Sequence, residues 1–144
     1  MDISANGQLL NPSLHDGHLL GLDLVREAVL HVRLRSLAGK GHMLELSGLK
    51  QLRCGEFREG NIVLDVEIMR GALSGPEEAK TREALVRLLV GELHPTVQDP
   101  FRSRHEGYIA RSLRSVEDGS LTLVRIDASY GCELTALCEK ADFL

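Results

Sequence analysis

The chain has 144 residues, of which 43% are apolar and 3% aromatic, and a formal net charge of -4 at pH 7. This length fits a single domain over residues 1–144, and the mild acidity without a basic block argues against a nucleic-acid partner. The opening residues lack the pattern of a signal peptide and no apolar run is long enough to span a bilayer, so we expect a cytoplasmic protein with no membrane partner.

The first half of the chain alternates apolar and polar residues with the period of a β-strand. Strands are predicted over residues 18–25, 29–36 and 42–47. In the second of these, the alternation predicts one buried face and one wet, cationic face that carries His31, Arg33 and Arg35.

The next two elements are a strand over 61–70 and a helix over 76–90. The strand places Asp65 and Glu67 on a face that we expect to be solvated, where they serve solubility rather than acid–base catalysis. The helix starts at Ser74-Gly75-Pro76-Glu77, which has the form of a capping box, and its apolar stripe is expected to lie on a sheet face.

Residues 92–104 are predicted to form a long loop, and three further strands follow it. These strands are predicted over residues 108–116, 120–127 and 132–138. The fold class is therefore α+β and mostly β, with about seven antiparallel strands in a β-sandwich or a partly open barrel and a single helix.

Two short patterns recur in the same order in the two halves. His15-Asp16-Gly17 returns as His105-Glu106-Gly107, and Glu45-Leu46-Ser47-Gly48-Leu49 returns as Glu133-Leu134-Thr135-Ala136-Leu137. The recurrence predicts internal repeats over 15–49 and 105–137, each a three-stranded meander, linked by the strand 61–70 and the helix 76–90. The competing interpretation is that any two amphipathic meanders share such patterns.

The repeated histidines and acids are the candidate site. If the repeats face each other, a divalent metal such as zinc or nickel takes imidazole and carboxylate ligands from this set. Its members are His15, Asp16, His18, His105 and Glu106. In the alternative interpretation these residues are turn and strand-entry positions that hold no cofactor, and the odd spacing of His15 and His18 favours that interpretation.

The three cysteines lack the spacing of a zinc site or of a disulfide framework, so buried, reduced thiols are expected. The chain also lacks a nucleophile elbow and a phosphate-binding glycine loop.

The run from Asn11 to Leu19, Asn-Pro-Ser-Leu-His-Asp-Gly-His-Leu, resembles the opening of small bacterial β-rich families of unknown function, some of them toxin-immunity-like proteins. Leu14 stands where those immunity proteins carry an aromatic residue. The resemblance implies a bacterial protein that binds another protein without catalysis.

We therefore predict a non-enzymatic protein-interaction module whose partner is another protein or a second copy of itself, with a homodimer expected from exposed strand edges. Its binding surface is a sheet face, a sheet edge or the loop 92–104. The alternatives are a metal-dependent hydrolase or isomerase that uses the duplicated His-acid pairs, and a sensor domain that binds a small molecule between the repeats.

Overall fold

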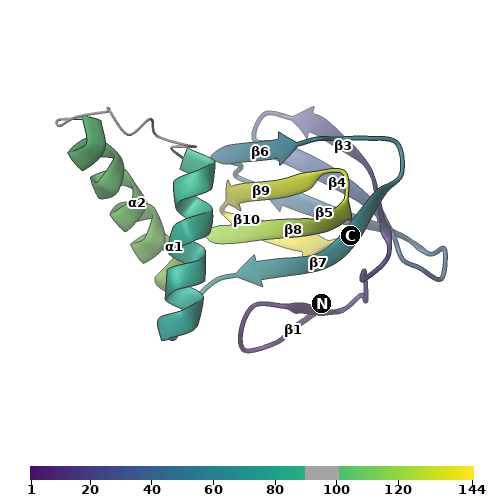
Figure 1. Cartoon of the computed structure of the whole chain (residues 1–144), viewed down its shortest axis with the longest axis horizontal. Coiled ribbons are helices and arrows are strands. Elements are labelled where there is room, and N and C mark those ends of the chain that lie inside the picture. Colours follow the sequence, from purple (N-terminus) through teal and green to yellow (C-terminus); the bar gives the residue numbers. More distant parts are fainter. Residues whose placement is uncertain (90–100) are drawn as a thin grey trace.

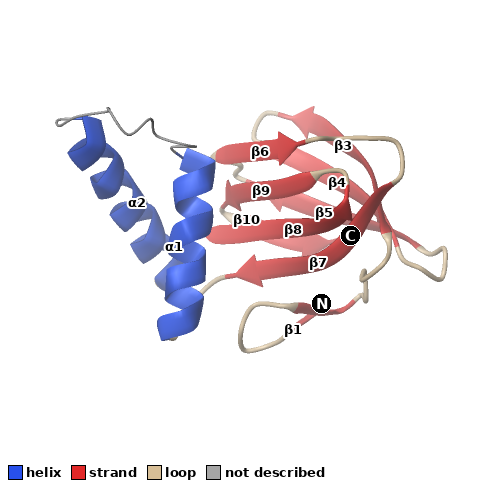
Figure 2. Cartoon of the chain, in the orientation of Figure 1, coloured by secondary structure: helices blue, strands red, loops and turns tan. Residues whose placement is uncertain are grey.

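The computed structural model describes residues 1–89 and 101–144 and combines β-strands with a pair of helices (Figure 1 and Figure 2). In chain order the elements are β1 (Asp2–Ile3), β2 (Leu9–Asn11), β3 (His18–Arg26), β4 (Val29–Arg35), β5 (Gly41–Ser47), β6 (Gln51–Gly55), β7 (Asn61–Met69), α1 (Gly75–Leu89), α2 (Phe101–Glu117), β8 (Thr122–Tyr130), β9 (Glu133–Cys138) and β10 (Lys140–Phe143). Within these residues, neither helix combines the length and apolar character that crossing a bilayer requires.

The strands form one bent antiparallel sheet and a small hairpin. The eight-stranded sheet has the order β10-β5-β4-β3-β7-β8-β9-β6, and β1 pairs only with β2. Figure 1 shows β3, β4, β5 and β10 behind β6 to β9. The described residues thus contain ten strands rather than about seven and two helices rather than one. Their main sheet is a continuous ladder with open edges, so the mostly β, α+β class is confirmed, whereas the strand count and the two-sheet sandwich differ from the prediction.

Two apolar clusters stabilise this arrangement. The first lies between the two halves of the bent sheet and is built from alternate residues of the strands, including Val32, Leu44 and Leu134. The second lies where the helices meet the outer face of the sheet, with Leu85 of α1 and Val116 of α2 near Leu123. The amphipathic helix predicted over 76–90 is confirmed as α1, and its buried stripe packs on the sheet as expected.

The strand predicted over 108–116 is wrong, because this segment lies inside α2. Its buried residues are Ile109, Ser112, Leu113 and Val116, which follow the spacing of one helix face. Residues 105–137 therefore contain part of a helix followed by two strands, whereas residues 15–49 contain three strands. The second three-stranded meander that the recurrence predicted does not form.

A bulge changes the phase of β7. The register between β7 and β8 shifts around Val63 and Asp65, so Val63 is buried and Leu64 is exposed. Beyond the bulge, Glu67 was expected on a solvated face, but it is only 5% exposed because α1 and β8 place basic side chains over it.

The prediction of reduced thiols is wrong for two of the three cysteines. Cys54 of β6 and Cys132, next to β9, form a disulfide, and Cys138 is free and buried. Disulfides persist in oxidising compartments and are uncommon in the reducing cytosol.

Candidate functional site

The first His-acid pair lies on an exposed turn before β3. Asp16 adopts a left-handed conformation with φ of 58°, and its Oδ2 lies 3.0 Å from His15 Nδ1. His18 begins β3, where it is opposite Ile62 at the start of β7. These residues thus occupy a turn and a strand entry, whereas His105 and Glu106, for which the same alternative interpretation predicted a turn and a strand entry, lie in α2.

The second pair is far from the first. His105 and Glu106 lie in α2. His18 lies opposite Ile62, at the start of β7, whereas both helices follow the other end of that strand. At about 3.3 Å per residue, the length of β7 separates the two ends by more than about 20 Å, and Figure 1 places α2 and the start of β3 at opposite ends of the molecule. Among the described residues, no group of three or more His, Cys, Asp or Glu side chains is placed to hold a metal.

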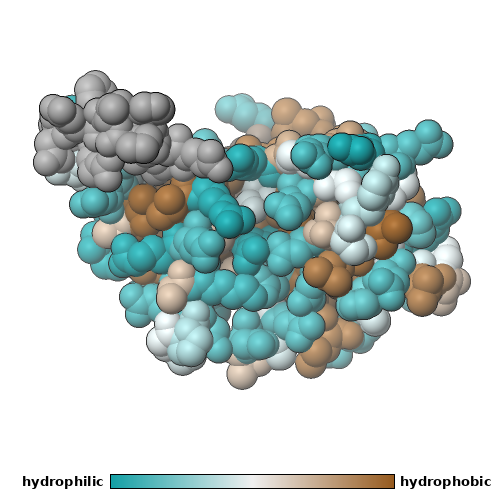
Figure 3. Space-filling model, viewed as in Figure 1, coloured by the Kyte–Doolittle hydropathy of each residue, from teal (hydrophilic) through white to brown (hydrophobic). Residues whose placement is uncertain are grey.

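A charged groove that the sequence did not reveal runs between α1 and the outer face of the sheet. Its volume is about 730 Å³, and its walls include Arg53, Lys80, Arg87, Asp127 and Glu133. Figure 3 shows that this side of the molecule is largely hydrophilic, with separate apolar groups near the N-terminal hairpin.

The ion pairs of this groove converge on buried Glu67. Lys80 Nζ donates to Glu67 Oε1, and Arg125 Nη1 donates to Glu67 Oε2 at 3.1 Å. The second terminal nitrogen of Arg125 donates to Asp127 Oδ1 at 2.9 Å. Because a buried carboxylate needs opposite charges and hydrogen bonds in place of water, we interpret this cluster as structural.

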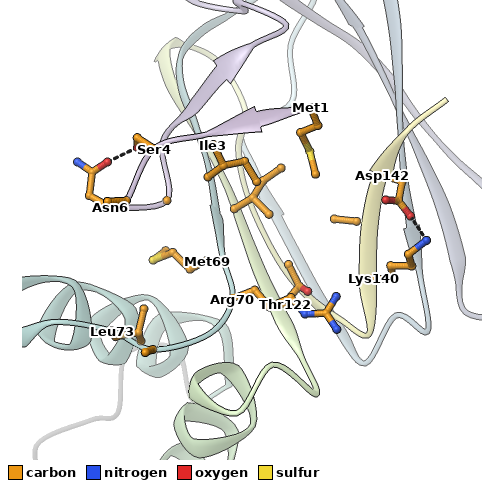
Figure 4. A pocket seen from close by; sticks show the side chains of 15 residues that line it. Met1, Ile3, Ser4, Asn6, Met69, Arg70, Leu73, Thr122, Lys140 and Asp142 are labelled. Carbon is orange, nitrogen blue, oxygen red and sulfur yellow. Dashed lines mark hydrogen bonds and ion pairs between the residues drawn. The ribbon is translucent and has the colours of Figure 1, made fainter.

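A second hollow, the N-terminal cleft, lies between the β1–β2 hairpin, the end of β7 and β10 (Figure 4). The hairpin is fixed to β7 by the Ile68 amide, which donates to the Gly7 carbonyl oxygen at 2.7 Å. Gly7 has φ of 87°, and a Cβ there would lie 2.9 Å from Met69 Cγ. Glycine is therefore required for this close approach.

The N-terminal cleft has a volume of about 420 Å³, and its walls are mixed. The apolar side chains lie beside six polar or charged residues, which are Ser4, Asn6, Arg70, Thr122, Lys140 and Asp142. Among these, Lys140 Nζ lies 2.6 Å from Asp142 Oδ2, so its charge is neutralised. Arg70 takes part in no ion pair or hydrogen bond within the described residues. Thr122 is 2% exposed, and its hydroxyl has no partner there either.

A third feature is the free edge of β3. On one side β3 pairs with β4 from His18 to Arg26, with register shifts at Leu20 and Val25. On the other side it pairs with β7 only through His18 and Leu19. Residues 20–26 therefore have no strand partner on that side within the described chain. We refer to these residues as the β3 edge; they include exposed Leu20, Leu24 and Val25.

None of the three cysteines is placed to act as a nucleophile. Cys54 and Cys132 are bonded to each other, and burial raises the pKa of the Cys138 thiol to about 12. Since the thiolate is the reactive form, Cys138 is an inert core residue at neutral pH.

Comparisons with protein-family models, with curated proteins and with solved structures gave no match for this chain. The resemblance of residues 11–19 to small bacterial β-rich families stays a prediction.

Proposed function

We propose that this protein is a non-enzymatic interaction module that binds protein by strand addition at the β3 edge, with a second copy of the chain as its partner. The observation that carries the proposal is the unpaired side of residues 20–26 in a strand that pairs with β4 on its other side from His18 to Arg26. Such an edge presents backbone donors and acceptors in the spacing that another extended strand needs.

The side chains of this edge favour association over solvation. Leu24 is 69% exposed and Val25 is 49% exposed, and the register of β3 against β4 shifts between Leu24 and Arg26. Proline and lysine, which usually keep a strand edge from pairing, do not occur in residues 20–26. The edge does carry the charges of Asp23 and Arg26 and two register shifts, and Leu24, between them, is its most exposed apolar residue. Two identical edges related by a two-fold axis can pair antiparallel, which makes a second copy the simplest partner.

The other surfaces suggested by the sequence support binding less well. Arg33 Nε donates to Asp23 Oδ2 at 2.7 Å, and His31 Nε2 lies 2.9 Å from Glu45 Oε2, so two of the three basic side chains on the cationic face of β4 are already paired with acids of neighbouring strands. Most of the predicted binding loop 92–104 lies outside the described residues. The β3 edge is the surface on which the proposal rests.

The test is the molar mass of the protein in solution, measured by light scattering or sedimentation over a wide concentration range. We expect a reversible dimer whose fraction rises with concentration. Leu24→Lys places a charge on the edge and is expected to shift the protein to monomer. Leu37→Lys is the matched control, because Leu37 is 71% exposed and lies outside β3.

Three outcomes would count against the proposal. A wild-type protein that stays monomeric at the highest concentration contradicts it, and so does a Leu24→Lys variant that dimerises as well as wild type. Loss of the dimer in both lysine variants would show that general surface hydrophobicity, rather than the β3 edge, drives association.

A further inference from the structure

We infer that the N-terminal cleft is a binding site for a small carboxylate with an apolar body, in which Arg70 pairs with the carboxylate. The inference is independent of the proposed dimer, because the cleft is built from the β1–β2 hairpin, the end of β7 and β10 rather than from β3. Three properties of the cleft lead to this ligand class.

The first property is the apolar wall. Ile3, Ile68, Met69 and Leu73 line the cleft together with Ala141. Ligand sites of this size are mostly apolar, with a small number of polar groups that orient the ligand. This part of the wall can contact a hydrocarbon or aromatic body, while Ser4 and Asn6 form a polar part of the same cleft.

The second property is the uncompensated positive charge. Asp142 neutralises Lys140, whereas Arg70 has no acidic partner in the described chain. In Figure 4 the Arg70 guanidinium extends between Thr122 and Lys140. A guanidinium offers two parallel N–H donors to a carboxylate, so the cleft is matched to an anionic group at this point.

The third property is the unpartnered hydroxyl of Thr122. This oxygen is buried at the cleft and makes no hydrogen bond within the described residues. A buried hydroxyl without a partner is unfavourable, and such groups are uncommon in folded proteins. A ligand carboxylate beside Arg70 would accept the missing hydrogen bond.

The position of Arg70 also explains how a charged group reaches the site. Arg70 and Lys140 line both the N-terminal cleft and a neighbouring open hollow of about 670 Å³. The hollow also contains three serines and Glu139, whose carboxylate is paired with Lys50 at 2.6 Å. The carboxylate therefore lies at the wet boundary between the two hollows, while the apolar body enters the cleft. This arrangement keeps the charge partly hydrated and limits its desolvation cost.

The experiment is a calorimetric titration of the full chain with decanoate, decanol and acetate. Decanoate combines the charge and the apolar body, and we expect it alone to bind. Arg70→Ala is expected to weaken decanoate binding by at least about tenfold, because a charge-assisted bidentate pair is lost. Arg82→Ala is the matched control, because it removes an exposed arginine of α1 that does not line the cleft.

A second variant tests the hydroxyl. Thr122→Val keeps the shape of the side chain, and we expect it to weaken decanoate binding by about tenfold without lowering the melting temperature of the ligand-free protein. That combination distinguishes a ligand-binding hydroxyl from a structural one, whose loss would lower the melting temperature.

The inference is overturned if decanoate does not bind, if decanol binds as tightly as decanoate, or if the Arg70→Ala variant keeps wild-type affinity. Arg70→Lys is a second variant in case the alanine variant misfolds. It keeps the positive charge but loses the planar, bidentate guanidinium, so we expect its affinity for decanoate to lie between those of wild type and Arg70→Ala. Wild-type affinity in both Arg70 variants would likewise exclude Arg70 as the carboxylate partner.

Discussion

The charged groove and the N-terminal cleft place two ionic side chains from the same stretch of chain in opposite situations. Glu67 is buried and held by Lys80 and Arg125, while Arg70, just beyond the end of β7, has no acidic partner within the described residues. In the groove, the charged groups pair with one another. In the cleft, the guanidinium of Arg70 has no acidic partner and the hydroxyl of Thr122 has no hydrogen-bond partner within the described residues. The difference indicates that the groove contributes to stability and the cleft to recognition.

The largest expected effect is the loss of Glu67. Glu67→Ala removes the carboxylate that Lys80 and Arg125 share and leaves Arg125 with Asp127 alone, and removing one member of a buried pair costs up to about 3 to 5 kcal/mol. Urea denaturation, followed by circular dichroism, measures the change in the free energy of unfolding. A loss below about 1 kcal/mol would mean that the cluster is solvated and that the contrast with the cleft is wrong.

Removal of the disulfide is expected to have the second-largest effect. Its cysteines, Cys54 and Cys132, are neighbours in sequence of Arg53 and Glu133, which line the same groove. The bond closes a loop with a sequence separation of 78, and its removal by a Cys54→Ser, Cys132→Ser double variant is expected to cost about 2 to 4 kcal/mol. The same denaturation experiment measures this.

Thiol counting provides the control for the disulfide. The native protein should react with no iodoacetamide at pH 8, because its single free thiol, Cys138, is buried with a raised pKa. Unfolding without reductant should expose that one thiol. Rapid labelling of three thiols in the unfolded, unreduced protein would show that the bond does not form.

Within the cleft, Gly7→Ala should destabilise the protein by about 1 to 3 kcal/mol, because it combines a left-handed backbone with a steric contact. Gly39→Ala separates the two causes: Gly39 has φ of 84°, but a Cβ at this position would have nothing within 4 Å, whereas the Cβ of residue 7 would meet Met69. Equal effects on the melting temperature would show that the hairpin does not pack tightly against β7.

The smallest effect is expected for the exposed ion pair of α1. Arg87 Nη2 lies 3.3 Å from Glu83 Oε1, and both side chains are more than half exposed. Glu83→Ala should therefore change the free energy of unfolding by less than about 0.5 kcal/mol. A loss comparable to that of Glu67→Ala would show that depth of burial does not separate the ion pairs of this groove.

Most of the strands could be predicted from the sequence because each has one face in the core. In β4, Leu30, Val32 and Leu34 are all buried, as the alternation predicted. The helix α1 was found for the same kind of reason, since its apolar residues repeat with the helical period.

The wrong prediction for residues 108–116 arose because the apolar residues of this short segment fit both the helical period and the strand period. Ile109, Leu113 and Val116 fit a helix face, but the echo of His15-Asp16-Gly17 in His105-Glu106-Gly107 favoured a repeated strand. Sequence likeness over a few residues does not fix backbone conformation, because tertiary packing decides between local alternatives.

Periodicity in the sequence was enough to predict the α+β composition, the position of α1 and the buried faces of the regular strands, because it reports which side of an element avoids water. The remaining features depend on contacts between distant segments. The bulge in β7 turns Val63 toward the core and Leu64 toward solvent. The folding of the sheet brings Cys54 next to Cys132. Basic side chains from α1 and β8 cover Glu67, which the sequence predicted on a solvated face. No local pattern encodes which of these segments meet. The same holds for the β3 edge and the Arg70 cleft, which are defined by the partners that their residues lack.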